Sequence, residues 1–263
     1  MTLWTDAHCH LQDRFGSNGE NAADVNATLV RAYEAGVDRV VVIGTDAASS
    51  GEALAITDLD GPVEIYATVG LHPHDATHEI GPVLEMARAG HPRLVGIGEC
   101  GLDYFYEHSA RSVQRGAFAA QIALAHELDL ALVIHARDAF DDLLDVLASE
   151  GVPPRTVVHC FTGTARDAQA CLELGCDISV SGVVTFKNAR SVREAVMTVP
   201  LDRLHVETDS PFLAPVPMRG RTNQPALVRV VGEFVANLRG EDVSTLRDAT
   251  AANTARLFQL PSR

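Results

Sequence analysis

Residues 131–160, ALVIHARDAFDDLLDVLASEGVPPRTVVHC, decide the fold class. Two short aliphatic runs, at 131–135 and 156–159, flank a stretch at 139–149 whose apolar residues recur with helical period. Both runs are too continuously apolar for antiparallel strands that have one face in water. A strand, a helix and a second strand of this kind form a crossover unit, so the two strands are predicted to be parallel.

The same unit recurs on both sides of this stretch, at intervals of roughly 30 residues. Eight strands are predicted, at residues 3–8, 39–43, 65–70, 94–99, 131–135, 156–159, 177–181 and 204–207. Helices are predicted at residues 23–35, 81–89, 110–128, 139–149, 165–174, 191–198, 225–239 and 244–257. Eight such units fit an α/β fold of the closed TIM-type (β/α)8 barrel class better than an open sheet.

Length and composition agree with this fold without requiring it. A chain of 263 residues could form one barrel or two small domains. No linker rich in Pro, Gly or Ser interrupts the series of strands and helices, so we expect one barrel domain over residues 1–263.

Cysteine usage and the N-terminal residues indicate the compartment. The five cysteines are an odd number without CxxC spacing, which argues against a disulfide framework and against a cysteine-built zinc site. No basic segment followed by an apolar run opens the chain, and no apolar run is long enough to cross a bilayer. We therefore expect a cytoplasmic protein without membrane contact, and no segment indicates an obligate protein partner.

Side chains able to bind a metal ion follow one predicted strand after another. They are His8, His10, His72, Glu99, His135, His159 and Asp209. The carboxyl ends of all barrel strands surround one mouth, so these side chains are expected to meet there. Nitrogen and oxygen ligands without thiolates suit zinc, manganese or magnesium. The set is large enough for two divalent ions, which in such sites lie roughly 3.5–4 Å apart.

Each of these positions also has a plainer interpretation. His8 and His10 lie two residues apart and share a strand face with Asp6, but an HxH pattern alone also occurs incidentally. Glu99 ends the apolar run RLVGIGE and could instead be a salt-bridged structural glutamate. A lone histidine at the position of His135 or of His159 is more often hydrogen-bonded in the core; two in the same register favour ligands.

The end of the last predicted strand adds an acidic group and a long loop. Asp209 lies two residues after Glu207 and can ligate a metal or accept a proton from an attacking water, or else cap the loop before Ser210. The Pro-rich stretch 210–225 is interpreted as an active-site loop, with a simple connector as the alternative.

Six ordered blocks of the sequence resemble the signature blocks of the TatD family of metal-dependent deoxyribonucleases. They are DAHCHL, GLHPH, GECGLDY, VIHARDA, HCFTG and ETDSPFL, and together they span essentially the whole chain. The resemblance implies a barrel of the amidohydrolase superfamily and a DNase, commonly exonucleolytic, that depends on divalent cations. The expected partner is DNA, as single strands or at strand ends.

The resemblance also implies roles for individual residues. His8, His10, Glu99 and Asp209 would hold one ion and Glu99, His135 and His159 the other, with Glu99 as the bridge. The residues implied for catalysis are Asp209, Glu99 and His72. The residues implied to face the substrate are His72, Arg137, Arg219 and Arg221. The family has RG-K-RN-x-P after the last strand, whereas residues 219–225 read RGRTNQP, with an extra Thr222 that leaves the aim of the two arginines open.

The net charge of −14 argues against a long surface for duplex DNA, because such surfaces are usually basic. Bound cations and a local arginine cluster can reverse the sign of the potential in one pocket. The acidity favours one alternative, a hydrolase of the same fold acting on a small ester, amide, lactone or phosphoester. A second alternative is a metal-binding scaffold without catalysis.

Overall fold

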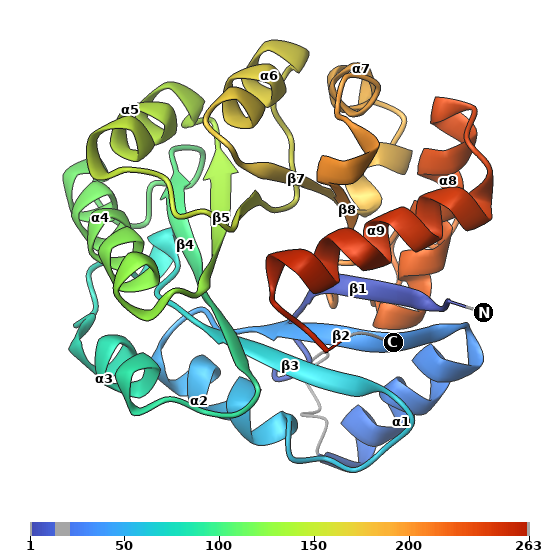
Figure 1. Ribbon diagram of the computed structural model, residues 1–263, viewed down its shortest axis with the longest axis horizontal. Coiled ribbons are helices and arrows are strands. Elements are labelled where there is room, and N and C mark those ends of the chain that lie inside the picture. Colours follow the sequence, from blue (N-terminus) through green and yellow to red (C-terminus); the bar gives the residue numbers. More distant parts are fainter. Residues whose placement is uncertain (1, 14–21, 262–263) are drawn as a thin grey trace.

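Eight parallel strands follow one another in chain order around a barrel in the computed structural model, which describes residues 2–13 and 22–261 (Figure 1). The strands are β1 (Trp4–Cys9), β2 (Val37–Ile43), β3 (Glu64–Val69), β4 (Leu94–Asp103), β5 (Ala131–Arg137), β6 (Thr156–Val158), β7 (Asp177–Val180) and β8 (Leu204–Val206). The predicted TIM-type (β/α)8 barrel is confirmed. β4 and β5 run further than predicted, since Cys100–Asp103 continue to pair with the end of β5.

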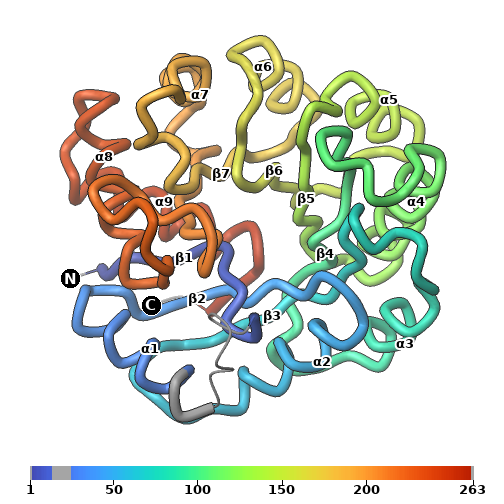
Figure 2. Tube along the Cα trace, turned by 180° about the vertical axis from the view of Figure 1, so that it is seen from behind, coloured from blue at the N-terminus to red at the C-terminus, as the bar shows by residue number. Residues whose placement is uncertain are grey.

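Helices surround the strands, as the two opposite views show (Figures 1 and 2). The α-helices are α1 (Ala22–Glu34), α2 (Ala47–Ile56), α3 (Gly81–Ala89), α4 (Arg111–Leu128), α5 (Phe140–Glu150), α6 (Ala165–Glu173), α7 (Arg190–Val196), α8 (Val228–Arg239) and α9 (Val243–Leu257). Short 3-10 turns lie at η1 (Pro73–Asp75), η2 (Gly182–Thr185), η3 (Leu201–Arg203) and η4 (Pro225–Leu227). All eight predicted helices are present with slightly shifted ends.

Helix α2 was not predicted. Its sequence, AASSGEALAI, is rich in small residues and contains a glycine, so it shows no clear apolar stripe. The signal that was available lies just before it. The side chain of Asp46 accepts a hydrogen bond from the N–H of Ser49 at 2.7 Å, which is the N-cap arrangement that starts a helix.

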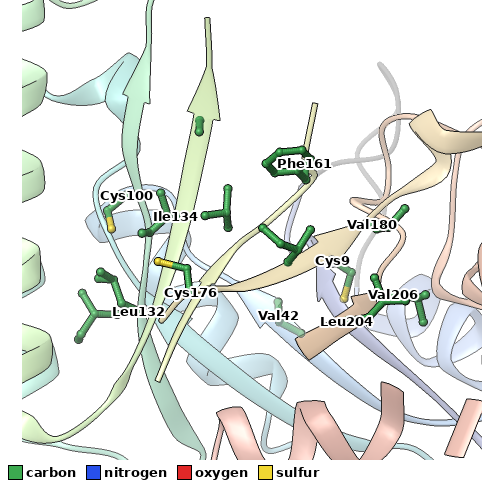
Figure 3. Close-up of a cluster of buried hydrophobic side chains, with 14 of the residues drawn as sticks. Cys9, Val42, Cys100, Leu132, Ile134, Phe161, Cys176, Val180, Leu204 and Val206 are labelled. Atoms are coloured by element: carbon green, nitrogen blue, oxygen red, sulfur yellow. The ribbon is translucent and has the colours of Figure 1, made fainter. Parts of the chain in front are cut away.

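Alternation along each strand separates the barrel interior from the layer under the helices. In β5, Ala131 and Val133 pack inside with Phe258 of the C-terminal segment, while Leu132 and Ile134 face outward (Figure 3). His135 follows Val133 with the same period of two. The histidine therefore continues an inward-facing row into the mouth of the barrel.

Two strands carry a bulge where they approach the mouth. Ile97 pairs with Leu132 and Cys100 with Ile134, so three steps along β4 match two along β5. Gly98 in this interval has φ +137°, and a Cβ on it would lie 2.5 Å from the carbonyl oxygen of Val133. β1 shifts register against β2 in the same way, between Asp6 and Cys9. Bulges re-aim side chains, and these two adjoin Glu99 and His8.

The barrel closes between its first and last strands through backbone contacts at the carboxyl ends. The N–H of Asp209 donates to the carbonyl of His8 at 2.9 Å, and the N–H of His10 donates to the carbonyl of Ser210 at 2.7 Å. Cys9 and Ser210 form the accompanying parallel bridge. This seam between β1 and β8 places three of the predicted ligands beside one another.

All five cysteines are free, as predicted, and all but Cys160 are buried. Cys9, Cys100 and Cys176 lie among the aliphatic side chains between strands and helices (Figure 3). Among the residues that the structure describes, no helix has both the length and the apolar character needed to cross a membrane.

Candidate metal centre

A cavity of about 870 Å³ opens at the carboxyl ends of the strands. Five of the six predicted ligands line it, namely His10, Glu99, His135, His159 and Asp209. The sixth, His8, is fully buried and contacts Glu99 and Asp209 below the cavity floor. The structure thus brings all six side chains into one cluster, from five different strands or the turns that follow them.

His8, His10, Asp209 and one oxygen of Glu99 form the first group. The Nε2 atoms of His8 and His10 are 3.1 Å apart, and they lie 3.4 and 3.6 Å from Oε2 of Glu99. Oδ1 of Asp209 is 3.7 Å from the first nitrogen and 3.4 Å from the second. Ligand atoms about 2.1 Å from one ion lie roughly 3.0–3.4 Å apart, so the group is close to the size that a divalent ion requires.

The other oxygen of Glu99 belongs to a second group. Oε1 lies 2.8 Å from Nδ1 of His135 and 2.7 Å from Nε2 of His159. These two separations are hydrogen-bond distances, so this group is more contracted than the first. Because Oε1 and Oε2 face different histidines, Glu99 lies between the two groups as a bridging ligand would.

Hydrogen bonds on the far side of three histidines determine which ring nitrogen carries a proton. Nδ1 of His10 lies 3.0 Å from the carbonyl of Ile43, and Nδ1 of His159 lies 3.2 Å from Oε1 of Glu207. Nε2 of His135 lies 3.1 Å from Oδ2 of Asp103. Each outer partner is an acceptor, so the outer nitrogen bears the hydrogen and the inward nitrogen of a neutral ring is a lone pair.

In the neutral rings those inward lone pairs would point at carboxylate oxygens or at one another. Two lone pairs at such distances repel unless a proton or a cation lies between them. Burial raises the pKa of Glu99, but His159, His72 and His135 outweigh it and hold that pKa well below its ordinary value. The glutamate is therefore ionised, and the donor set suits hard or borderline divalent ions.

His8 differs from the other histidines. Its Nδ1 is buried without a hydrogen-bond partner among the described residues, and its ring stacks on His159 with centroids 3.9 Å apart. Burial lowers the pKa of His8, and the charge of a protonated His159 lowers it further. His8 is thus a neutral nitrogen donor at neutral pH, the form that binds metal ions.

His72 approaches the second group but is arranged as a donor. Its Nε2 lies 3.4 Å from Oε1 of Glu99, and its Nδ1 accepts a hydrogen bond from the N–H of His74 at 3.1 Å. Burial lowers the pKa of His72 to about 4, so the ring is neutral and Nε2 carries the hydrogen. A ring in this state is a hydrogen-bond donor at Nε2 and has no lone pair there for a metal ion, although the atom lies close to those of Glu99 and His135.

The predicted substrate-contacting arginines lie at different places. Arg137 lines the cavity, at the end of β5. Arg219 and Arg221 are not among its lining residues within the described chain, although Arg219 lies 3.9 Å above the ring of Phe186, which does line it. The loop 210–225 is held by buried Asn223, whose Nδ2 donates to the carbonyls of Thr208 and Phe212. Phe212 lines the cavity, so this loop is part of the mouth.

Asp103 is a site residue that the sequence reasoning missed. Its Oδ2 lies 2.9 Å from Nε2 of His74 as well as 3.1 Å from that of His135. Burial raises the pKa of Asp103, but its bonds to His135 and the N–H of Tyr106 outweigh burial and keep the pKa below the ordinary range. The available signal was its position in the block GECGLDY, four residues after Glu99.

Comparison with known proteins gives a consistent result. A family model described as TatD-related DNase matches residues 5–259. The metal-dependent hydrolase YabD of Bacillus subtilis is 38% identical, over 97% of this chain and 98% of that protein. The 3'-5' ssDNA/RNA exonuclease TatD of Erwinia tasmaniensis is 38% identical over 91% and 95%. The crystal structure of the TatD homologue YJJV of Escherichia coli superposes with a TM-score of 0.90, at 30% identity and 98% coverage of both chains.

Proposed function

Because this chain belongs to the TatD-related DNase family, we propose that it is a divalent-metal-dependent nuclease that hydrolyses phosphodiester bonds at the ends of single-stranded nucleic acid. The observation that supports the proposal best is the set of inward-facing histidine lone pairs around Glu99. Their outer nitrogens are fixed by Ile43, Asp103 and Glu207. Such an arrangement needs positive charge at its centre, which divalent cations would supply and which protons on His10, His135 and His159 supply without them.

Two ions are proposed, of magnesium, manganese or zinc. His8, His10, Glu99 and Asp209 would hold one, and Glu99, His135 and His159 the other. Bound divalent ions would lower the pKa of a water to about 7 and offset the charge that develops on the phosphoryl group. The protein's own contribution is to fix the ligands, to exclude bulk water and to position the substrate.

Asp209 is proposed as the proton acceptor. It is the most exposed carboxylate of the cluster, with 13% of its side chain accessible, and it lines the cavity. Burial raises its pKa, but the hydrogen bond to His10 and the positive charges of His159 and His10 keep that pKa below the ordinary value. An ionised Asp209 can orient a water for in-line attack on phosphorus and take its proton as the new bond forms.

His72 and Arg137 are proposed to hold the phosphate that is cut. His72 lines the cavity beside the second group, and its Nε2 lies 3.4 Å from Oε1 of Glu99. Arg137 supplies a positive charge at the same wall, and a guanidinium suits phosphate oxygens. Together they would bind the phosphoryl oxygens and stabilise the charge that grows during the reaction.

Metal analysis and a cleavage time course test this function together. The purified protein, reloaded with manganese or magnesium, is incubated with end-labelled single-stranded and duplex DNA. Stepwise shortening of the single strand from one end is expected, and Glu99→Ala should abolish it. Glu150→Ala, on an exposed position at the end of α5, serves as the matched control. Full activity of Glu99→Ala, or a wild type that binds no metal and cuts neither DNA, would contradict the proposal.

A small-molecule hydrolase is the second candidate, and the net charge of −14 is the observation that favours it. A cavity of about 870 Å³ would also accommodate such a substrate. The same preparation distinguishes the two. Turnover of small phosphoesters or lactones at high efficiency, with no cleavage of either DNA, would assign the protein to this candidate.

A further inference from the structure

Exposed aromatic side chains concentrate at the barrel mouth. Phe105, Tyr106, Phe212 and Tyr33 are the strongly exposed aromatic residues of the described chain, with 56%, 50%, 53% and 47% of their surface accessible. The first three line the cavity above the predicted metal ligands. Exposed apolar groups gathered around one opening mark a surface that binds something.

These aromatic residues lie on opposite sides of the opening. Phe105 and Tyr106 directly follow β4, and Phe212 lies in the loop after β8. The strands occur in chain order around the barrel, so β4 and β8 are four strands apart in a ring of eight and face each other across it (Figure 1). Phe105 and Phe212 therefore line the same cavity from opposite sides of the barrel.

The Phe105 side of the mouth is tied to the predicted metal centre. Oδ1 of Asp103 accepts hydrogen bonds from the N–H groups of Phe105 and Tyr106 at 3.0 and 2.9 Å. Its other oxygen contacts His135 at 3.1 Å. One carboxylate thus fixes both the backbone of an aromatic turn and a predicted metal ligand, so the turn that carries the two rings has a set position relative to His135.

Positive charge accompanies the rings. The guanidinium of Arg137 lies 4.1 Å from the centroid of Phe105 and 4.7 Å from that of Tyr106. Arg219 lies 3.9 Å from the centroid of Phe186 on another part of the wall. Arginine beside exposed aromatic rings is the combination with which proteins hold single-stranded nucleic acid, through phosphate contacts and base stacking.

We infer that Phe105 and Phe212 stack on unpaired bases next to the scissile phosphate, so that the site selects unpaired nucleotides at a strand end. The inference rests on the proposed nuclease function and deepens it. It also resolves how a chain with net charge −14 holds a polyanion. Stacking and a few local cations supply the affinity, and a broad basic surface is not needed. A base inside a duplex has both faces covered by its neighbours, and even the terminal pair exposes only its outer face, whereas an unpaired base can be turned out to meet a ring.

Abasic substrates test the stacking role directly. A short single-stranded oligonucleotide is compared with the same oligonucleotide carrying tetrahydrofuran residues in place of the last nucleosides at the attacked end. The wild type should prefer the intact strand by at least about fivefold in kcat/KM, because the stacking of one base on an aromatic ring strengthens binding by at least about that factor. Phe105→Ala and Phe212→Ala should lose this preference because they cleave the intact strand more slowly. Their rate on the abasic strand should equal that of the wild type.

Controls separate stacking from damage to the site. Tyr33→Ala removes an aromatic ring of similar exposure on α1, away from the mouth, and should keep the wild-type preference. Phe105→Leu keeps apolar volume without a flat ring and replaces Phe105→Ala if that variant does not fold. A terminal 2-aminopurine provides a second measurement, because its fluorescence falls on stacking. The fall should be smaller with either phenylalanine variant.

The possible results are distinguishable. Wild-type cleavage of both oligonucleotides at equal rates overturns the stacking role while leaving the nuclease function intact. An equal loss on both substrates in the variants also overturns it, because the rings would then only support the site. If light scattering shows that the variants change the oligomeric state and not the preference, the rings form a protein contact instead. No cleavage by the wild type removes the nuclease function and this inference together.

Discussion

Oδ2 of Asp103 lies 3.1 Å from Nε2 of His135, on the opposite side of the imidazole from Glu99. This contact fixes the ring's orientation and leaves Nδ1 as the inward donor. Asp103→Asn places an amide where the carboxylate was, so His135 loses its acceptor while Oδ1 still receives the N–H groups of Phe105 and Tyr106. We expect metal affinity to fall by about 10- to 100-fold, which is the usual effect of removing a group that orients a ligand.

Chelator competition measures that affinity, and kcat and KM are measured separately. A fall in kcat at saturating metal, with KM little changed, would indicate a positioning role. Asp142→Asn makes the same change in a carboxylate that bonds Tyr104 outside the cavity, so it should retain wild-type metal affinity. Equal effects of the two substitutions would show that Asp103 acts only through stability.

Metal loading should stabilise the fold, because the ligand side chains come together only in the native state and the ion therefore binds the folded chain more tightly. Manganese at about 100 times its dissociation constant should add about 2.7 kcal/mol per site to the free energy of unfolding. Thermal melts with and without chelator measure the shift. His10→Ala should abolish much of it, whereas His78→Ala, with 62% of its side chain accessible, should not. A melting temperature independent of manganese in the wild type would contradict a native metal site.

Binding of single-stranded DNA should depend only weakly on salt. Each phosphate contact contributes about 0.7 to the slope of log affinity against log salt for single strands. Arg137→Ala should lower the magnitude of the slope by about that amount. Arg190→Ala on α7 removes an arginine that is 87% exposed and should leave the slope unchanged. A steep slope that neither substitution alters would point to a basic surface elsewhere.

Acid stability should depend on Asp177 at the other end of the barrel. Its carboxylate contacts Arg203, Nε2 of His205 at 3.0 Å and Nη2 of Arg256 at 3.1 Å. Burial raises the pKa of Asp177, but His205 and Arg203 outweigh burial and hold it below the ordinary value of 3.8. A carboxyl group whose native pKa is depressed contributes stability above its unfolded pKa and loses it as pH falls through the native pKa.

Asp177→Asn should therefore cost about 1–3 kcal/mol at neutral pH, and less as the pH falls below about 4. Urea unfolding across this pH range, in excess chelator, measures the difference from wild type. Asp248→Asn is the control. The side chain of Asp248 is 53% exposed in its ion pair with Arg247, so this change should alter the free energy of unfolding by less than about 0.5 kcal/mol. If the difference in free energy of unfolding between wild type and Asp177→Asn grew as the pH fell, the pKa of Asp177 would not be depressed in the native state.

Two glycines in helices should respond oppositely to alanine. A Cβ on Gly232 of α8 would lie 2.3 Å from the indole of Trp4, so Gly232→Ala should destabilise the protein by about 1–3 kcal/mol. Gly116 of α4 is exposed, and a Cβ on it would meet no atom within 4 Å beyond its chain neighbours and the adjacent backbone of its own helix. Gly116→Ala should stabilise by about 0.5–1 kcal/mol through helix propensity. Denaturant titration of both variants checks the pair, and a stabilised Gly232→Ala would contradict this packing.

The sequence allowed the fold and the clustering of the ligands to be predicted for one physical reason. Parallel strands of a barrel end at the same mouth, and alternation along a strand carries Val133 and His135 to the same face. The convergence of His135 and His159 follows without knowledge of any distance. The roles of these residues as ligands remain predictions.

Other parts of the site depend on contacts that no local pattern encodes. The pairing of Asp103 with His74 requires the relative positions of two strand ends, which are fixed by the barrel and its bulges. Where Arg219 and Arg221 point depends on how Asn223 holds the loop after β8. Helix α2 is rich in small residues and has no apolar stripe, so its sequence shows no helical period from which it could be predicted.

The seam between β1 and β8 has a consequence for biosynthesis. His8 and His10 are translated before Asp209, and seven further strands separate them from it along the chain. The backbone bonds from Asp209 to His8 and from His10 to Ser210 can form only after the chain has been synthesised as far as Ser210. A nascent chain thus carries the first histidines long before their acidic partner, and the complete first group appears only when the last strand docks.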